Sequence, residues 1–166
     1  MPRRLLRDRQ IVVDEWRYVA EAAADAAVPL IVTFDQWQAE PDTWTRRAGR
    51  LGVVLSPAQT VERLAPDLAR FALIGAEFSG PGEGRGYTQA RLLRERWNFK
   101  GELRATGYVR RDQLFFMARC GFNSFELPES DLEDAATAFS TFSAAYQQSN
   151  DIGLAFKLQP DIPAIA

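Results

Sequence analysis

Apolar residues occur in short runs separated by longer amphipathic stretches, and this alternation predicts strands connected by helices. Compact runs at residues 30–34, 51–55 and 71–78 are rich in β-branched and other apolar side chains, which is typical of buried strands. Residues 58–68 carry apolar side chains at helical spacing. Connections of this length are too long for hairpins, so we expect the strands to run parallel in one α/β sheet.

The rest of the chain is expected to continue this order. Residues 1–10 are interpreted as a flexible basic arm, and residues 1–166 as a single α/β domain. Thr88 is expected to cap the helix that follows it. Further strands are expected at residues 102–106, 123–127 and 152–158, and further helices at residues 15–27, 35–47, 89–97, 112–119 and 130–148.

The two faces of the predicted strands differ in polarity. In the strands at residues 71–78, 102–106 and 123–127, one face is apolar, whereas the other carries Glu77, Arg104 and Glu126. A doubly wound sheet buries both of its faces and should be apolar on both. The pattern therefore favours a mostly parallel, open partial (β/α) barrel with helices outside and a polar concave face. A doubly wound three-layer sheet is the alternative.

Two scarcities in the composition limit the chemistry. The chain has no histidine, which excludes imidazole bases and imidazole metal ligands, and Cys120 is its single cysteine. One cysteine excludes an internal disulfide, a Cys-X-X-Cys pair and an iron–sulfur cluster held by one chain, and it suits a reducing cytoplasmic location. We expect no metal site. No apolar run is long enough to span a bilayer, and no secretory signal is expected at the N-terminus.

Positive charge is concentrated in the middle of the chain. Residues 80–120 hold nine basic and four acidic residues and carry a net charge of +5, whereas the remainder carries −7. The acidic pI of about 5.3 argues against nucleic-acid binding. The asymmetry instead predicts an arginine-lined mouth that binds a small anion or an acidic partner.

A glycine-rich loop at residues 80–86 is the first candidate site. A loop of this kind between a strand and a helix presents backbone N–H groups and the positive end of the helix dipole to an anion, and Arg85 would add a bidentate donor. The spacing matches neither the dinucleotide nor the Walker fingerprint, and a loop that only turns the chain is the alternative. The full set of candidate anion- or cofactor-binding residues is Gly82, Gly84, Arg85, Gly86, Tyr87, Arg104, Arg110 and Arg111.

The polar face is the second candidate site. Glu77, Arg104 and Glu126 lie near the carboxyl ends of their strands, the edge at which ligands bind in open α/β sheets. The arginine could orient a ligand or keep one carboxylate ionised as a base. The commoner use of such a triad is an ion network that neutralises buried charges, and we favour that interpretation. No catalytic residue is assigned.

Four stretches carry a resemblance to a known family: EGRGYTQARLLR (residues 83–94), GELRATG (101–107), RDQL (111–114) and RCGF (119–122). They resemble the bacterial domain of unknown function family 934, whose members are labelled as probable oxidoreductases of sulfite reduction. The family carries that label because its genes lie beside the genes for assimilatory sulfite reductase. The family pattern has Asp-Gly-Arg-Gly-Tyr-Ser and Gly-Phe-Asp, where this chain has Glu83, Thr88 and Asn123.

The resemblance implies two functions from different classes. The first is an accessory protein of assimilatory sulfite reduction, non-catalytic alone, whose arginine-lined mouth binds a small anion or sulfite reductase. The second is an oxidoreductase that borrows NADP or a flavin and holds the cofactor phosphate at residues 82–86. A homodimer that covers the polar face is compatible with either function.

Overall fold

The computed structural model describes residues 3–21 and 27–139, and its central feature is an eight-stranded sheet with the order β2-β1-β8-β7-β6-β5-β4-β3. The strands are β1 (Arg4–Arg7), β2 (Gln10–Val13), β3 (Arg17–Tyr18), β4 (Leu30–Thr33), β5 (Leu51–Leu55), β6 (Leu73–Phe78), β7 (Glu102–Gly107) and β8 (Ser124–Phe125). The α-helices are α1 (Phe34–Ala39), α2 (Pro41–Thr45), α3 (Val61–Leu64), α4 (Arg85–Glu95), α5 (Leu114–Cys120) and α6 (Glu129–Leu132). The 3-10 helices are η1 (Val19–Glu21), η2 (Ala65–Arg70), η3 (Arg111–Gln113) and η4 (Ala135–Phe139).

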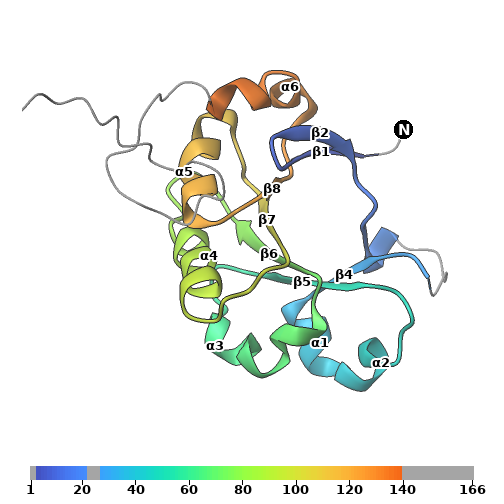
Figure 1. The fold of residues 1–166 in the computed structure, drawn as a ribbon. Coiled ribbons are helices and arrows are strands. Elements are labelled where there is room, and N and C mark those ends of the chain that lie inside the picture. The colour runs from blue at the N-terminus through green and yellow to red at the C-terminus, as the bar shows by residue number, and fades with distance from the viewer. Residues whose placement is uncertain (1–2, 22–26, 140–166) are drawn as a thin grey trace, which may run out of the picture.

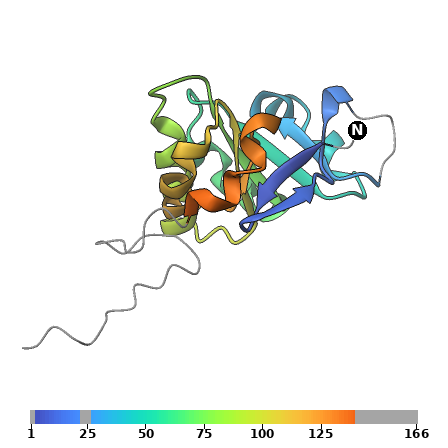
Figure 2. The same cartoon turned by 90° about the horizontal axis from the view of Figure 1, so that it is seen from above.

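The sheet is an open half-barrel. Strands β3 to β8 are parallel, and only the hairpin of β1 and β2 runs antiparallel, with β1 paired to β8. The sheet curls into a C shape with the helices on its outer side (Figures 1 and 2). The prediction of a mostly parallel, open partial barrel is therefore confirmed, and the chain does not form the alternative, a doubly wound three-layer sheet.

The main hydrophobic core lies between the convex face of the sheet and the helices. Each parallel strand contributes its outward apolar residues, and the helices contribute the apolar residues of one face. This packing explains why alternate positions of β6, β7 and β8 are apolar. The core includes Val32, Val53, Ile74, Ala105 and Phe125 from the strands and Trp37, Leu64, Ala90, Leu93 and Met117 from the helices.

The concave face is crossed by the chain itself. Residues 14–16 connect β2 at one end of the sheet to β3 at the other, so they span the open side of the C (Figure 1). Trp16 packs there against Ile31, Val54 and Leu73 in a second, smaller apolar cluster. The crossing segment therefore covers the face that the helices leave uncovered.

Two expectations about the N-terminal region were wrong. The flexible arm predicted for residues 1–10 instead contains β1, whose Leu5 and Leu6 are fully buried, and the turn of the hairpin. The helix predicted for residues 15–27 is replaced by β3 and η1 in its described part, and residues 22–26 lie outside the described residues. Arg17 and Tyr18 instead pair with Leu30 and Ile31 of β4, and Leu6 and Arg7 pair with Phe125 and Ser124 of β8, so both segments gain backbone hydrogen bonds at the sheet that no local pattern indicates.

Several helix boundaries also differ from the prediction. Helix α4 begins at Arg85, so Thr88 lies inside the helix and does not cap it. The helix predicted at residues 58–68 is split into α3 and η2, because Pro66 has no N–H to continue the α-helical ladder. The helix predicted at residues 130–148 appears as α6 and η4 up to Phe139, and the rest lies outside the described residues, as does the strand predicted at residues 152–158.

Candidate functional site

The concave face holds a buried arginine at its centre. Arg104 lies on β7 between Gly75 of β6 and Ser124 of β8, and its side chain is 0% exposed. Across the face lies Asp14, which is 2% exposed and belongs to the segment that crosses the open side of the sheet.

All five N–H groups of Arg104 have carboxylate acceptors. Nη1 donates to Asp14 Oδ2 at 3.0 Å and to Glu126 Oε1 at 3.1 Å. Nη2 donates to Asp14 Oδ1 at 3.0 Å and to Glu102 Oε1 at 2.7 Å, and Nε donates to the same Glu102 oxygen at 3.0 Å. A guanidinium has no further donors, so an external anion would have to displace one of these carboxylates.

Two further arginines complete this cluster, which we call the concave ion cluster: Arg7 of β1 and Arg3, the residue before β1. Arg3 donates through Nε to Asp14 Oδ2 at 3.0 Å and lies 3.7 Å from Glu126. Arg7 lies 3.6 Å from Glu102. The concave ion cluster thus contains three arginines, Arg3, Arg7 and Arg104, and three carboxylates, Asp14, Glu102 and Glu126, so its formal charge is zero.

The pKa shifts in this cluster follow from burial and charge. Burial by itself would raise the pKa of Asp14, but the hydrogen bonds and charge of Arg104, with those of Arg3, hold it below its usual value. Burial opposes the charge of Arg104, but its carboxylate partners raise its pKa, so it stays protonated. Tyr18 donates to Glu126 Oε1 at 3.0 Å, and burial followed by the charge of Glu126 raises the pKa of Tyr18 well above its usual value.

Glu77 shares the concave face but is separate from the concave ion cluster. It pairs in register with Thr106, one row beyond Arg104 towards the carboxyl ends of the strands. Its side chain is exposed, and it forms no ion pair within residues 3–21 and 27–139. Of the three residues predicted on this face, the structure therefore brings together Arg104 and Glu126 and leaves Glu77 at the open edge.

The glycine loop leads directly into α4, as an anion-binding loop would. Gly82 has a positive φ of 82°, and Gly84 precedes the first helical residue. However, the Glu83 carboxylate accepts the backbone N–H of Arg85 at 3.0 Å. A side chain of the protein thus already interacts with the positive end of the helix dipole, and an external anion would compete with it. Gly86 and Tyr87 pack against Phe78, with the Phe78 and Tyr87 ring centroids 5.2 Å apart.

Each of the predicted arginines on the loops has a partner within the chain. Arg85 is exposed beside Glu83 and donates to the Pro57 carbonyl at 3.4 Å. Arg110 lies 3.3 Å from Asp131 beside α6, and Arg111 donates to the Asp134 carbonyl at 3.1 Å. The hydrogen-bond acceptor of Arg111 and the carboxylate beside Arg110 thus both lie outside residues 80–120. The anion-binding role of these residues stays a prediction.

Asn123, where the family pattern has aspartate, has a structural role here. Its Oδ1 accepts the Leu103 N–H at 2.8 Å, and its Nδ2 donates to Asp8 Oδ1 at 3.2 Å. Asp8 lies in the turn between β1 and β2. An amide can satisfy both neighbours, whereas a carboxylate at this position would face the carboxylate of Asp8.

Helices α4 and α5 form a mixed apolar and charged surface, which we call the α4–α5 face. Phe116 is 54% exposed on α5, one helical turn from Cys120, and Arg91 on α4 influences the Cys120 thiol. Burial raises the pKa of Cys120, and Arg91 opposes this only in part. Burial, and then the charges of Cys120 and Asp112, raise the pKa of Tyr87. Helices α4 and α5 pack against each other, so these residues belong to adjacent elements.

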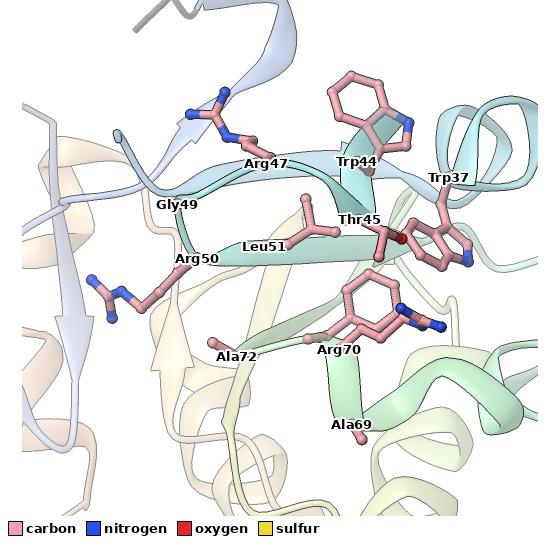
Figure 3. A pocket seen from close by; sticks show the side chains of 11 residues that line it. Trp37, Trp44, Thr45, Arg47, Gly49, Arg50, Leu51, Ala69, Arg70 and Ala72 are labelled. Carbon is pink, nitrogen blue, oxygen red and sulfur yellow. The ribbon is translucent and has the colours of Figure 1, made fainter. Parts of the chain in front are cut away.

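A cavity of about 390 Å³ lies at the opposite edge of the sheet, where β5 and β6 begin (Figure 3). It lies between α2 and η2, and apolar and arginine side chains surround it. The sequence patterns did not single it out, because its walls come from three separate stretches of the chain. Its lining residues are Trp37, Trp44, Thr45, Arg47, Gly49, Arg50, Leu51, Ala69, Arg70, Phe71 and Ala72.

Sequence reasoning missed Asp14 and Tyr18 as members of the concave site. Tyr18 lies in the stretch predicted to be helical, residues 15–27, and Asp14 lies just before it. Asp14 reaches Arg104 from a position 90 residues away in sequence. The only local signal was a pair of acids, Asp14 and Glu15, directly after the apolar residues 11–13. Within the described residues, no group of three acidic, histidine or cysteine side chains could hold a metal ion, and no helix is long and apolar enough to cross a membrane.

Comparison with known proteins identifies a family but no characterised relative. A family model described as "Bacterial protein of unknown function (DUF934)" matches residues 52–155. This range includes strands β6 to β8, α4, α5 and the glycine loop. A search of curated proteins finds no match.

Proposed function

The chain belongs to the DUF934 family, and we propose that it is an accessory protein of assimilatory sulfite reduction that docks onto a partner through the α4–α5 face. The observation that carries the proposal is the exposure of Phe116, at 54%. Neighbouring Leu114, Phe115 and Met117 are all buried, so α5 packs well on its inner side and presents a large aromatic ring on its outer side.

The surroundings of Phe116 favour protein recognition. Aromatic and arginine side chains are enriched where proteins bind one another, and one exposed ring can supply much of the binding energy. The Phe116 ring contacts the Phe115 ring edge to face, with ring centroids 5.7 Å apart at an angle of 82°. Arg91 is 57% exposed on the adjacent helix. A rigid aromatic side chain with a nearby cation suits a partner surface that has an apolar pocket rimmed by carboxylates.

The concave ion cluster supports a structural use of the most buried charges. Arg104 has no free donor, and its carboxylate partners tie together the hairpin, the crossing segment and the central strands. These charges therefore contribute to the architecture, and the proposal assigns recognition to the exposed side chains of α4 and α5 instead. The sequence resemblance suggests sulfite reductase as the partner.

The experiment is a binding titration between this protein and assimilatory sulfite reductase from the same organism, at low and at high ionic strength. We expect binding at low salt that weakens as salt rises, because rim charges steer the encounter. Phe116→Ser should weaken binding by about tenfold or more, since a central aromatic contributes at least ~1.4 kcal/mol at a hot spot.

The matched control is Val13→Ser, which removes an apolar side chain of similar exposure (57%) from β2, far from α5 in the fold. It should leave binding unchanged. Absence of a complex at low ionic strength with both proteins folded would refute the proposal. Equal losses in the two variants would refute the assignment of the α4–α5 face.

A further inference from the structure

We propose that the cavity at the beginning of β5 and β6 is a binding site for a small planar organic anion, an aromatic or heteroaromatic ring that carries a phosphate or carboxylate. The cavity is lined by residues at the start of β5 and β6, whereas the glycine loop follows the end of β6, so the two lie at opposite edges of the sheet. It does not use the α4–α5 face, so this inference is independent of the proposed function.

The cavity has apolar walls and one accessible aromatic ring. Leu51, Phe71 and Trp37 are nearly fully buried, and Trp37 meets Phe71 edge to face at 5.0 Å, so these three form fixed walls. Trp44 is only partly buried, and its Nε1 donates to the Gln36 carbonyl at 2.9 Å, which fixes the orientation of the indole. Trp44 is therefore the ring that a planar ligand can contact.

A cation is held in place at one end of the cavity. Arg70, 49% exposed, donates through Nε to Asp67 Oδ1 at 3.1 Å. The other oxygen of Asp67 accepts the Trp37 Nε1–H at 3.3 Å, so the carboxylate is fixed by the same tryptophan that forms the wall. Within the described part of the chain, the two Nη groups of Arg70 have no acceptor, which leaves a paired donor for phosphate or carboxylate.

The opposite end of the cavity also carries arginines, but their side chains are held by other partners. Arg47 donates through Nη2 to the Val28 carbonyl at 2.6 Å. Arg50 lies 2.7 Å from Glu15 and stacks 5.1 Å above the Trp16 ring, so its charge is partly neutralised. In Figure 3 these two guanidinium groups extend to one end of the cavity, and that of Arg70 lies at the other, beside Trp37. Three arginines thus line the cavity, of which Arg50 and Arg70 are each paired with one acid, and Arg70 is the donor whose two Nη groups can turn to a ligand.

The size of the cavity limits the ligand. Small-molecule sites in proteins are roughly 300–1,000 Å³ in volume, and this one, at about 390 Å³, lies near the lower limit. It can accommodate one ring system and one anionic group, but a dinucleotide would extend beyond it. Adenosine monophosphate and benzoate are suitable probes for the phosphate and carboxylate forms.

The experiment follows the indole N–H signals of the four tryptophans by NMR of the ¹⁵N-labelled full chain during titration with each probe. Trp44→Phe assigns the signal of Trp44. We expect the Trp44 and Trp37 signals to shift and the Trp97 signal, from outside the cavity, to stay constant. Adenosine and inorganic phosphate, which each carry half of the recognised chemistry, should bind at least about tenfold more weakly than adenosine monophosphate.

Two variants locate the binding energy. Arg70→Gln should weaken binding of the anionic probes by about tenfold, because it removes a charge-assisted pair of hydrogen bonds, and should leave adenosine unaffected. Arg96→Gln is the control, since Arg96 also stacks on a tryptophan, Trp97, at 4.8 Å, but lies outside the cavity. Binding of adenosine monophosphate or benzoate that is weakened by Arg70→Gln but not by Arg96→Gln supports the proposal. No shift with both probes, binding of phosphate as tight as that of adenosine monophosphate, or equal effects of the two variants would overturn it.

Discussion

Replacement of Arg104 by methionine should destabilise the protein in a way that depends on pH. Methionine fills a similar volume on the concave face, but it leaves Asp14, Glu102 and Glu126 without their shared cation. Asp14 is the most affected of the three carboxylates, because it is 2% exposed and receives two hydrogen bonds from Arg104.

The magnitude follows from the partners that remain. Removal of one partner from a buried ion pair costs about 3–5 kcal/mol. Arg3 still donates to Asp14 at 3.0 Å, and Arg7 remains 3.6 Å from Glu102, so part of the negative charge stays compensated. We therefore expect a loss of about 3 kcal/mol at neutral pH, which lowers the urea midpoint by roughly 1–2 M with an ordinary slope.

The pH dependence tests the cause of this loss. In the native protein the pKa of folded Asp14 is below its usual value, so this residue contributes stability above its unfolded pKa, and the contribution is lost as pH falls through the folded pKa. In the variant, burial without Arg104 should raise the pKa of Asp14. Its ionised form is then unfavourable in the folded state, and the penalty is relieved as pH falls. The difference in unfolding free energy between the two proteins should therefore shrink in acid.

The assay is urea unfolding followed by tryptophan fluorescence at a series of pH values from neutral to acid. Arg91→Met serves as the control, because Arg91 pairs with Glu95 on the surface of α4, and such pairs contribute less than about 1 kcal/mol. A loss in Arg104→Met as small as in Arg91→Met, or one that does not change with pH, would contradict the view that Arg104 neutralises buried carboxylates.

Three further predictions concern single positions. Asn123→Ala should lower the unfolding free energy by about 1–3 kcal/mol, because it leaves the Leu103 N–H without its acceptor; urea unfolding measures this, and Asn123→Asp should retain more of the stability at low pH, where its carboxyl is protonated, than at neutral pH. Gly107→Ala should cost more than about 1 kcal/mol, because Gly107 has a φ of 80° and an added Cβ would overlap the Phe78 carbonyl; a thermal midpoint equal to that of the native protein would disprove this. Cys120 should react with iodoacetamide more slowly than free cysteine at neutral pH, because burial raises the pKa of its thiol; denaturation should remove the difference.

The sequence by itself determined the architecture to a large extent. The alternation of apolar runs and amphipathic stretches predicted parallel strands, and the unequal faces of β6, β7 and β8 predicted a curled sheet with a polar concave side. These features are local, because the period of two along a strand and the spacing along a helix are set by neighbouring residues. The family was also identified from contiguous motifs, and the match over residues 52–155 confirms it.

Only the tertiary structure decided which charges meet. Arg104 was expected on the polar face, but its main partner, Asp14, comes from a segment that crosses the sheet from one edge to the other. The arginines of the middle segment were expected to form one mouth, which stays a prediction, and the partner of Arg110, Asp131, comes from a later element of the chain. No local pattern encodes such contacts, because they depend on strand order and on how the chain returns across the open side of the half-barrel. The cavity beside Trp44 arises in the same way, where separate connections meet at one edge of the sheet.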